Sequence, residues 1–292
     1  RLRLIGAELQ NLTIDAGGIA PGGERSLARA HAQSRGRKVL LLGVDSGDWT
    51  IINRLRAAGR LKTIDHAVKT GASGPLRSIE PLLSPLIWTT IATGVGPEKH
   101  GILDFLTPDP ATGKMVPATS RLRTAPAIWN LAPAYGRTAG VVGWLATWPP
   151  EPIDGFIVTD RFGFLAFAGR VASDPTASDI AHPPDLLTDR ADRSVSSASI
   201  PAADVGRFLK VPAAEIEAAR RSGYEKGNRI GNFIHTLATA ESYASLGLDL
   251  YRSEPADLMM VYFEFVDATC HLFMPFAPPK RPEISADDAR RF

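Results

Sequence analysis

The sequence contains a single cysteine, Cys270, among 292 residues. One cysteine cannot form an internal disulfide, and it excludes structural zinc sites built from two or four cysteines. Any metal ion bound by this chain must therefore be held mainly by oxygen and imidazole ligands.

Long hydrophobic runs and tracts of like charge are also missing. The longest apolar runs, at 39–44, 141–148 and 258–263, fall far short of the roughly 18 to 20 residues that cross a bilayer, so no membrane span is predicted. The 33 Lys and Arg are balanced by 31 Asp and Glu and are spread along the chain, which gives no indication of a nucleic-acid partner. The sequence carries no signal for localisation or oligomeric state.

The apolar runs that are present predict an α/β fold. Residues 38–44 form a continuous aliphatic run, which is typical of a strand buried on both faces of a parallel sheet. Further strands are predicted at 138–144, 155–159 and 258–264, and helices at 49–58, 63–70, 86–93, 126–135, 213–220 and 228–246. This alternation predicts an α/β/α sandwich with a mostly parallel central sheet and a helical insertion.

Composition divides the chain into four expected parts. Residues 1–37, rich in Gly, Ala, Ser and Arg, are expected to be a flexible lead-in, and residues 38–160 the first part of the α/β core. Residues 161–257 are expected to be a helical insertion or cap, and residues 258–292 a return to the core that is incomplete.

Polar residues follow two of the predicted strands. Asp45 comes directly after the first strand, where open parallel sheets place their ligands, and it could be a metal ligand or the cap of the next helix. Asp267 and His271 follow the strand at 258–264, and a helix there would place both on one face. That pair fits zinc or a similar divalent ion, but it also fits a structural ion pair.

Ser84 lies between these groups, in Glu80-Pro-Leu-Leu-Ser-Pro85. A metal ion could activate its hydroxyl as a nucleophile toward phosphorus. The alternative is a loop serine that starts the next helix. A Ser-His-Asp hydrolase is disfavoured because no serine lies in a Gly-x-Ser-x-Gly elbow. For His100, hydrogen bonding to the local backbone is favoured over a ligand role.

In this order, the motifs resemble the alkaline phosphatase superfamily, in its type I phosphodiesterase/nucleotide pyrophosphatase-like branch of phosphohydrolases and phosphomutases. The motifs are an aliphatic strand ending in Asp45, then Pro-Leu-Leu-Ser84-Pro, Thr93-Gly-x-x-Pro-x-x-His100-Gly, and Tyr262-Phe-Glu-x-x-Asp267-x-x-x-His271. The similarity runs from about residue 38 to the end.

The resemblance implies a site with two divalent ions, zinc in the first instance, that acts on a small-molecule phosphate ester. It implies Asp45 as a ligand of the ion that also binds the nucleophile Ser84, and Asp267 with His271 as ligands of the other ion. It further implies a phosphoserine intermediate on Ser84.

Two features depart from the family pattern. The superfamily completes its site with a later Asp-His pair and a final His, and no Asp-His pair follows His271. We therefore expect the chain to be a piece of a longer protein. Leu103, Asp104 and Phe105 stand where nucleotide pyrophosphatases often carry an asparagine.

The leading hypothesis is a metal-dependent phosphohydrolase or phosphodiesterase; the alternatives are a phosphomutase and a non-catalytic, truncated binding module.

Overall fold

The computed structural model describes residues 38–108, 112–163, 179–279 and 281–292, so the lead-in expected over residues 1–37 lies outside the described ranges. The strands are β1 (Val39–Val44), β2 (Leu106–Pro108), β3 (Met115–Pro117), β4 (Ala139–Val142), β5 (Gly155–Val158), β6 (Ala181–His182) and β7 (Leu258–Phe263). The α-helices are α2 (Trp49–Ala57), α3 (Lys62–Thr70), α4 (Ser84–Thr93), α5 (Pro97–His100), α6 (Ile128–Leu131), α8 (Ala202–Val205), α9 (Ala213–Ser222), α10 (Arg229–Ser253), α11 (Phe265–Phe273) and α12 (Asp288–Arg291). Short 3-10 turns are η3 (Ser120–Leu122), η4 (Ala132–Tyr135), η6 (Ala191–Arg193), η7 (Ser197–Ser199) and η8 (Met274–Phe276).

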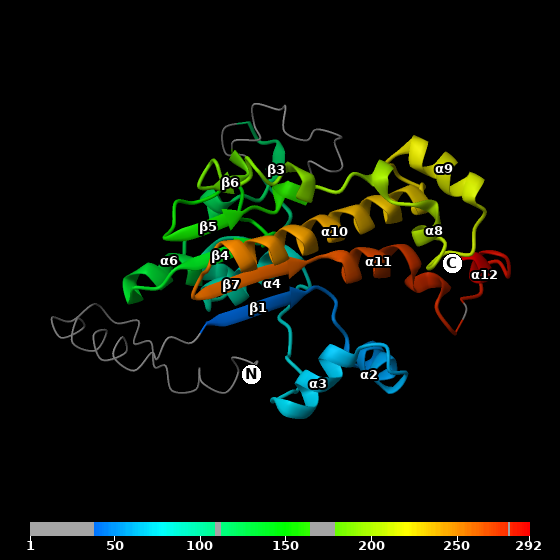
Figure 1. The fold of residues 1–292 in the computed structure, drawn as a ribbon, viewed down its shortest axis with the longest axis horizontal. Helices are drawn as coiled ribbons and strands as arrows, with labels where there is room; N and C mark the ends of the chain where they lie inside the picture. The colour runs from blue at the N-terminus through cyan, green and yellow to red at the C-terminus, as the bar shows by residue number, and fades with distance from the viewer. Residues whose placement is uncertain (1–37, 109–111, 164–178, 280) are drawn as a thin grey trace.

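A five-stranded sheet with the order β1-β7-β4-β5-β6 forms the centre of the described structure (Figure 1). In this sheet, β1, β7, β4 and β5 are parallel to their neighbours, and β6 pairs with β5 in the antiparallel sense. In the register of β1 and β7, Val44 lies opposite Phe263. The segments that follow β1 and β7 therefore leave the sheet side by side at the same edge, although more than 200 residues separate them in the sequence.

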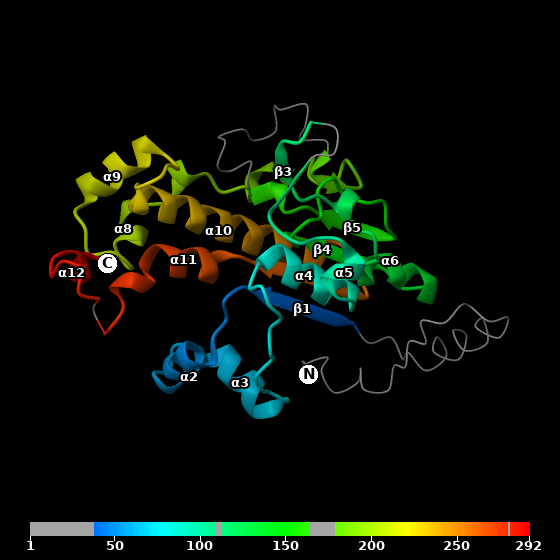
Figure 2. The same cartoon turned by 180° about the vertical axis from the view of Figure 1, so that it is seen from behind.

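Helices cover both faces of this sheet. Successive residues of β7 point to opposite faces: Met259 and Val261 pack into a cluster with Tyr243 and Leu246 of α10, whereas Met260 packs into a second cluster on the other side. The second cluster contains residues of α4 and α6, namely Trp88, Ala92 and Trp129. Accordingly, α10 lies along one face and α4 along the other (Figures 1 and 2). This arrangement confirms the predicted α/β/α architecture.

Helix α10 connects the sheet to the far end of the molecule. It runs to Ser253, beyond the predicted end at residue 246. Its first half packs against α8, α9 and α11 through a third apolar cluster that includes Phe233 and Ile234. Within the range 161–257, β6 extends the sheet and α10 covers it, while the division of the chain at those boundaries stays a prediction.

One predicted helix is shorter than its sequence pattern indicates. The segment 126–135 forms α6, which ends at Leu131, and continues as the 3-10 turn η4. Pro133 has no N–H and its ring would clash with the carbonyl of Trp129, so an α-helix cannot continue through it.

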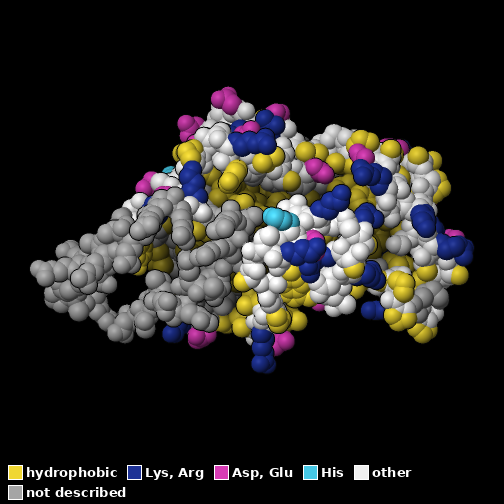
Figure 3. All heavy atoms as spheres, turned by 60° about the horizontal axis from the view of Figure 1, so that its bottom comes forward, with side chains coloured by type: hydrophobic (Ala, Val, Ile, Leu, Met, Phe, Trp, Pro, Cys, Tyr) yellow, Lys and Arg dark blue, Asp and Glu magenta, His cyan; other side chains and the backbone are white. Residues whose placement is uncertain are grey.

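Among the residues that the structure describes, few cover the side that carries β1, α2 and α3. Helices α2 and α3 stand away from the sheet, and none of their residues is buried (Figures 1 and 2). Leu42 and Val44 of the edge strand β1 are 54% and 45% exposed. Hydrophobic side chains are correspondingly visible on this face, with Lys and Arg scattered rather than gathered (Figure 3). Across the described residues, no helix has the length and apolar character needed to span a membrane.

Candidate functional site

The predicted site begins where β1 and β7 end. The backbone N–H of Asp45 donates to the carbonyl oxygen of Phe263 at 3.0 Å, which extends the pairing of the two strands by one residue. Helix α11 starts two residues later, at Phe265. The parallel sheet thus brings Asp45 beside the start of the helix that carries Asp267 and His271.

Asp45 does not cap the helix that follows it. That cap is Asp48, whose Oδ1 accepts from the N–H groups of Thr50 at 2.8 Å and Ile51 at 3.2 Å. The carboxylate of Asp45 instead accepts the N–H of Ser46 on Oδ1 at 3.0 Å and the hydroxyl of Tyr262 on Oδ2 at 2.7 Å. The capping alternative for Asp45 is therefore wrong, and its carboxylate remains at the sheet edge.

Asp267 and His271 lie on one face of α11, as their spacing predicts. The Nε2 atom of His271 is 3.4 Å from Oδ2 of Asp267, so the structure also contains the ion-pair contact that was the alternative interpretation. The two side chains differ in exposure, with His271 80% exposed and Asp267 only 22% exposed. The other carboxylate oxygen, Oδ1, accepts the hydroxyl of Ser46 at 2.6 Å. Asp45 and Asp267 are thus linked through one serine.

Ser84 is the first residue of α4 and is half-buried. The N-cap is Leu83, and no side chain caps this helix, so Ser84 starts the helix without using its hydroxyl to do so. Within the described part of the chain, that hydroxyl has no hydrogen-bond partner, and no hydrogen bond joins Ser84 to Asp45, Asp267 or His271. The structure links Asp45 to Asp267 through Ser46 and places His271 beside Asp267, and it leaves Ser84 at the start of a helix without a hydrogen bond to them.

A third carboxyl group at this edge, Glu264, was not singled out by the sequence analysis. Although Glu264 as a whole is exposed, desolvation of its carboxyl group raises its pKa, and the nearby carboxylates of Asp267, Asp45 and Asp160 raise it further. Asp45, Asp160 and Glu264 each lie within two residues of the end of a strand, namely β1, β5 and β7. That position could have drawn attention to Asp160 and Glu264 in the sequence. A bound cation would offset the repulsion among these groups.

The donors at this edge fit a divalent ion in kind, since carboxylate oxygen and imidazole nitrogen are common ligands of zinc. They do not form a closed site by themselves. Among the residues that the structure describes, no group of three or more His, Cys, Asp or Glu side chains converges tightly enough to hold a metal ion. A metal held here by Asp45, Asp267 and His271 would need further ligands.

Asp160, at the end of β5, is a second residue that sequence analysis missed. Its Oδ2 accepts the N–H of Ala146 at 3.0 Å, and the hydroxyl of Tyr243 donates to its backbone carbonyl at 2.9 Å. Burial raises the pKa of its carboxyl to about 6. With Tyr243, Tyr262 and Glu264, this residue lines a small cavity behind the sheet edge.

The raised pKa of Asp160 gives a prediction for stability. Because the folded chain holds this proton more tightly than the unfolded chain, the stabilisation is complete below about pH 4 and is lost as the pH rises through about 6. In the wild type, the free energy of unfolding should therefore fall by on the order of 2 kcal/mol over this pH range, after discounting for the solvent that reaches the side chain. Asp160→Asn should remove this fall. Urea unfolding at about pH 4 and about pH 7 measures the difference between wild type and variant.

The control for this prediction is Asp154→Asn, an exposed carboxylate just before the same strand. It should keep the pH dependence of the wild type. Parallel stability curves for wild type and Asp160→Asn across this pH range would show that Asp160 does not couple protonation to folding.

His100 has the structural role that its sequence context favours. It is fully buried, and its Nδ1 accepts the N–H of Ile102 at 3.2 Å. Nε2 therefore carries the proton and donates to the hydroxyl of Thr90 at 2.9 Å. Burial lowers the pKa of this imidazole, which keeps it neutral. The prediction that His100 bonds the local backbone is confirmed.

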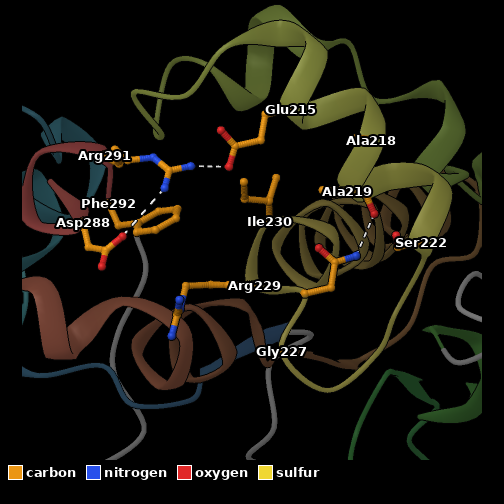
Figure 4. Close-up of a pocket in the computed structure, with 11 residues that line it drawn as sticks. Glu215, Ala218, Ala219, Ser222, Gly227, Arg229, Ile230, Asp288, Arg291 and Phe292 are labelled. Carbon is orange, nitrogen blue, oxygen red and sulfur yellow. Dashed lines mark hydrogen bonds and ion pairs between the residues drawn. The ribbon is translucent and has the colours of Figure 1, made fainter. Parts of the chain in front are cut away.

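A larger cavity, of about 380 Å³, lies elsewhere, between α9, the start of α10 and α12 (Figure 4). Its charged groups are already paired: Arg291 contacts Glu215 and Asp288, and Arg229 donates to the carbonyl oxygen of Leu272. None of the predicted site residues lines it. This cavity is separate from the carboxylate cluster at the sheet edge.

Comparison with known proteins assigns the chain to a family. The family model for type I phosphodiesterase / nucleotide pyrophosphatase matches residues 39–290, which is most of the chain. The chain belongs to this family. The type I phosphodiesterase/nucleotide pyrophosphatase family consists of phosphoric ester hydrolases of the alkaline phosphatase superfamily, so the resemblance in the sequence is confirmed.

Similar solved structures are distant. Two crystal structures of phosphonoacetate hydrolase from Sinorhizobium meliloti 1021, in complex with phosphonoacetate and with phosphonoformate, each match with 17% identity and a TM-score of 0.44. Each match covers 79% of this chain and 47% of the phosphonoacetate hydrolase chain. This member of the family thus spans about half the length of the solved structures that it matches. No curated protein matches the sequence.

Proposed function

We propose that the chain carries the catalytic edge of a metal-dependent phosphohydrolase or phosphodiesterase that acts on a small-molecule phosphate ester. The observation that carries this proposal is the link between Asp45 and Asp267 through Ser46, because it joins two carboxylates from the segments that follow two neighbouring strands of a phosphodiesterase-family fold. The family assignment supports the reaction class. The preferred metal, zinc in the first instance, and the presence of two ions belong to the proposal.

In this proposal, Asp45 and Ser84 contribute ligands to one ion, and Asp267 with His271 to the other. Bound divalent ions would lower the pKa of the serine hydroxyl and stabilise the negative charge that develops on the ester oxygens. The chain's own groups would hold and orient these ligands. The free hydroxyl of Ser84 supports its role, since no hydrogen bond in the described structure competes for it.

The proposed reaction has two displacement steps at phosphorus. The Ser84 oxygen attacks the phosphorus atom, the bond to the leaving alcohol breaks, and the alcohol takes up a proton as phosphoserine forms. Water then attacks the phosphoserine, which releases phosphate or a phosphate monoester and restores the hydroxyl. Transfer to a second hydroxyl of the substrate in place of water would give a phosphomutase, and an isomerised product without free phosphate distinguishes the two.

A second candidate function is a binding module without turnover. The observation that favours it is the open ligand set, since the described residues contain no closed group of three metal-binding side chains. Such a module would bind a divalent ion weakly or not at all and would hydrolyse no ester.

Removal of metal tests the proposal directly. Chelation of the purified protein should lower hydrolysis of bis-p-nitrophenyl phosphate or p-nitrophenyl phosphate by about 100-fold or more, and added zinc or manganese should restore it. The measurement is release of p-nitrophenol with metal content determined in parallel. If hydrolysis persists unchanged in the chelated protein, the metal-dependent mechanism is wrong, and if no ester is hydrolysed with metal bound, the binding module is favoured.

A further inference from the structure

We propose that Ser46 and Tyr262 are positioning residues for the proposed metal site. Ser46 joins the carboxylates of Asp45 and Asp267, and Tyr262 fixes the orientation of Asp45. This inference rests on the proposed function, because it takes Asp45 and Asp267 as metal ligands, and it assigns a role to two residues that the resemblance leaves without one.

Ser46 contacts both carboxylates at once. Its backbone N–H donates to Oδ1 of Asp45 at 3.0 Å, and its hydroxyl donates to Oδ1 of Asp267 at 2.6 Å. Hydrogen bonds to ionised carboxylates are short and strong, and the hydroxyl bond is at the short end of the usual range. One residue therefore sets the relative position of two carboxylates that lie on different segments of the chain.

The backbone at Ser46 makes this arrangement costly for any residue with a side chain. Its φ is +55°, in the left-handed region where glycine is favoured and other residues are uncommon. Glycine would adopt this conformation without the steric penalty of a Cβ atom, yet it could not donate to Asp267. A serine is expected in this conformation only where its hydroxyl has a function, here the hydrogen bond to Asp267. Residues with such unfavourable backbone conformations are concentrated at functional sites.

Tyr262 holds the other oxygen of Asp45 from inside the core. Its hydroxyl donates to Oδ2 at 2.7 Å, and the residue is only 2% exposed. The ring packs edge-on against Trp88 at a centroid distance of 4.8 Å and lies 6.2 Å from Trp144. A Cβ atom on Gly43 would lie 2.6 Å from the Trp88 ring, so the glycine makes room for this packing. The phenol is thus held rigidly as a donor to Asp45.

Together the two residues fix both oxygens of Asp45 and one oxygen of Asp267. Each carboxylate oxygen can accept more than one interaction, so these hydrogen bonds leave lone pairs for a cation. Partners that orient metal ligands in this way contribute to metal affinity, and their loss lowers it by about 10- to 100-fold. A purely structural role would instead change stability and leave metal affinity unaltered.

The test uses three variants of the full chain: Ser46→Gly, Ser46→Ala and Tyr262→Phe. Zinc affinity is measured by competition with a chelator of known affinity, and thermal unfolding is measured for the metal-free proteins. Both Ser46 variants should bind zinc about 10-fold or more weakly, and Tyr262→Phe should show a loss of similar size. Ser46→Gly alone should match or exceed the unfolding temperature of the wild type, because glycine relieves the strained φ.

Ser46→Gly is expected to lower zinc affinity without lowering the unfolding temperature. This combination separates a positioning role from a general loss of structure. Thr70→Ala is the control: it removes an exposed hydroxyl that bonds the carbonyl of His66 in α3, and it should leave zinc affinity unchanged. Wild-type affinity in both Ser46 variants and in Tyr262→Phe would overturn the inference while leaving the proposed function intact. A wild-type protein that binds no divalent ion would overturn both.

Discussion

Replacement of Ser84 by alanine is expected to abolish hydrolysis of phosphate esters while leaving the fold and most of the metal affinity intact. The change removes the oxygen that attacks phosphorus, and loss of a nucleophile lowers turnover by at least about 1,000-fold. Ser84 does not cap α4, and its hydroxyl bonds no described residue, so the fold should lose little when it is removed. The measurement is kcat for an aryl phosphate ester together with the unfolding temperature.

A direct readout of the intermediate sharpens this prediction. Rapid acid quench during turnover, followed by mass spectrometry of the peptide 78–99, should detect phosphoserine at position 84 in the wild type and none in Ser84→Ala. The matched control is Thr93→Val, which removes a hydroxyl from the other end of the same helix, where it donates to the carbonyl of Thr89. Full turnover in Ser84→Ala would remove Ser84 from the mechanism.

The buried strands and their order in the sequence were accessible without a structure. The aliphatic run that ends at Val44 and the one that ends at Phe263 have the pattern of strands covered on both faces, and both are strands of the central sheet. From those two strands, the positions of Asp45 and Asp267 at the carboxyl edge follow by the general rule for open parallel sheets. That is why Asp45 and Asp267 come together in space, linked through Ser46.

The partners of those carboxylates could not be read from the sequence. The contact between Tyr262 and Asp45 depends on β7 lying next to β1 with Gly43 opposite Tyr262, a register that links residues more than 200 positions apart. The left-handed backbone of Ser46 has no sequence signal, since glycine is the residue normally expected in that conformation. Glu264 lies inside the motif that contains Asp267, but its raised pKa comes from desolvation of its carboxyl group and from nearby carboxylates, two of which, Asp45 and Asp160, lie on other segments.

The length and the role of helix α10 could not be predicted from the sequence, for a different reason. The 25-residue helix α10 has no single apolar stripe along its length, because one half packs on the sheet and the other half packs between α9 and α11. Its length and its role as a cover of the sheet therefore had to come from tertiary structure. The same packing matters for the site, because α10 supports the helix that carries Asp267 and His271.

Replacement of Asp267 by asparagine is expected to weaken zinc binding by at least about 100-fold, since it removes a charged ligand and not just a neighbour of one. The amide keeps the shape of the side chain and one oxygen that can accept the Ser46 hydroxyl, so stability should change far less than affinity. Competition with a chelator measures affinity, and calorimetry measures unfolding. Asp48→Asn, which neutralises a carboxylate two residues beyond Ser46 but can still cap α2, serves as the control for a general charge effect. Equal losses of affinity in the two variants would show that the net charge of this edge attracts the ion, whereas a loss confined to Asp267→Asn identifies Asp267 as a ligand.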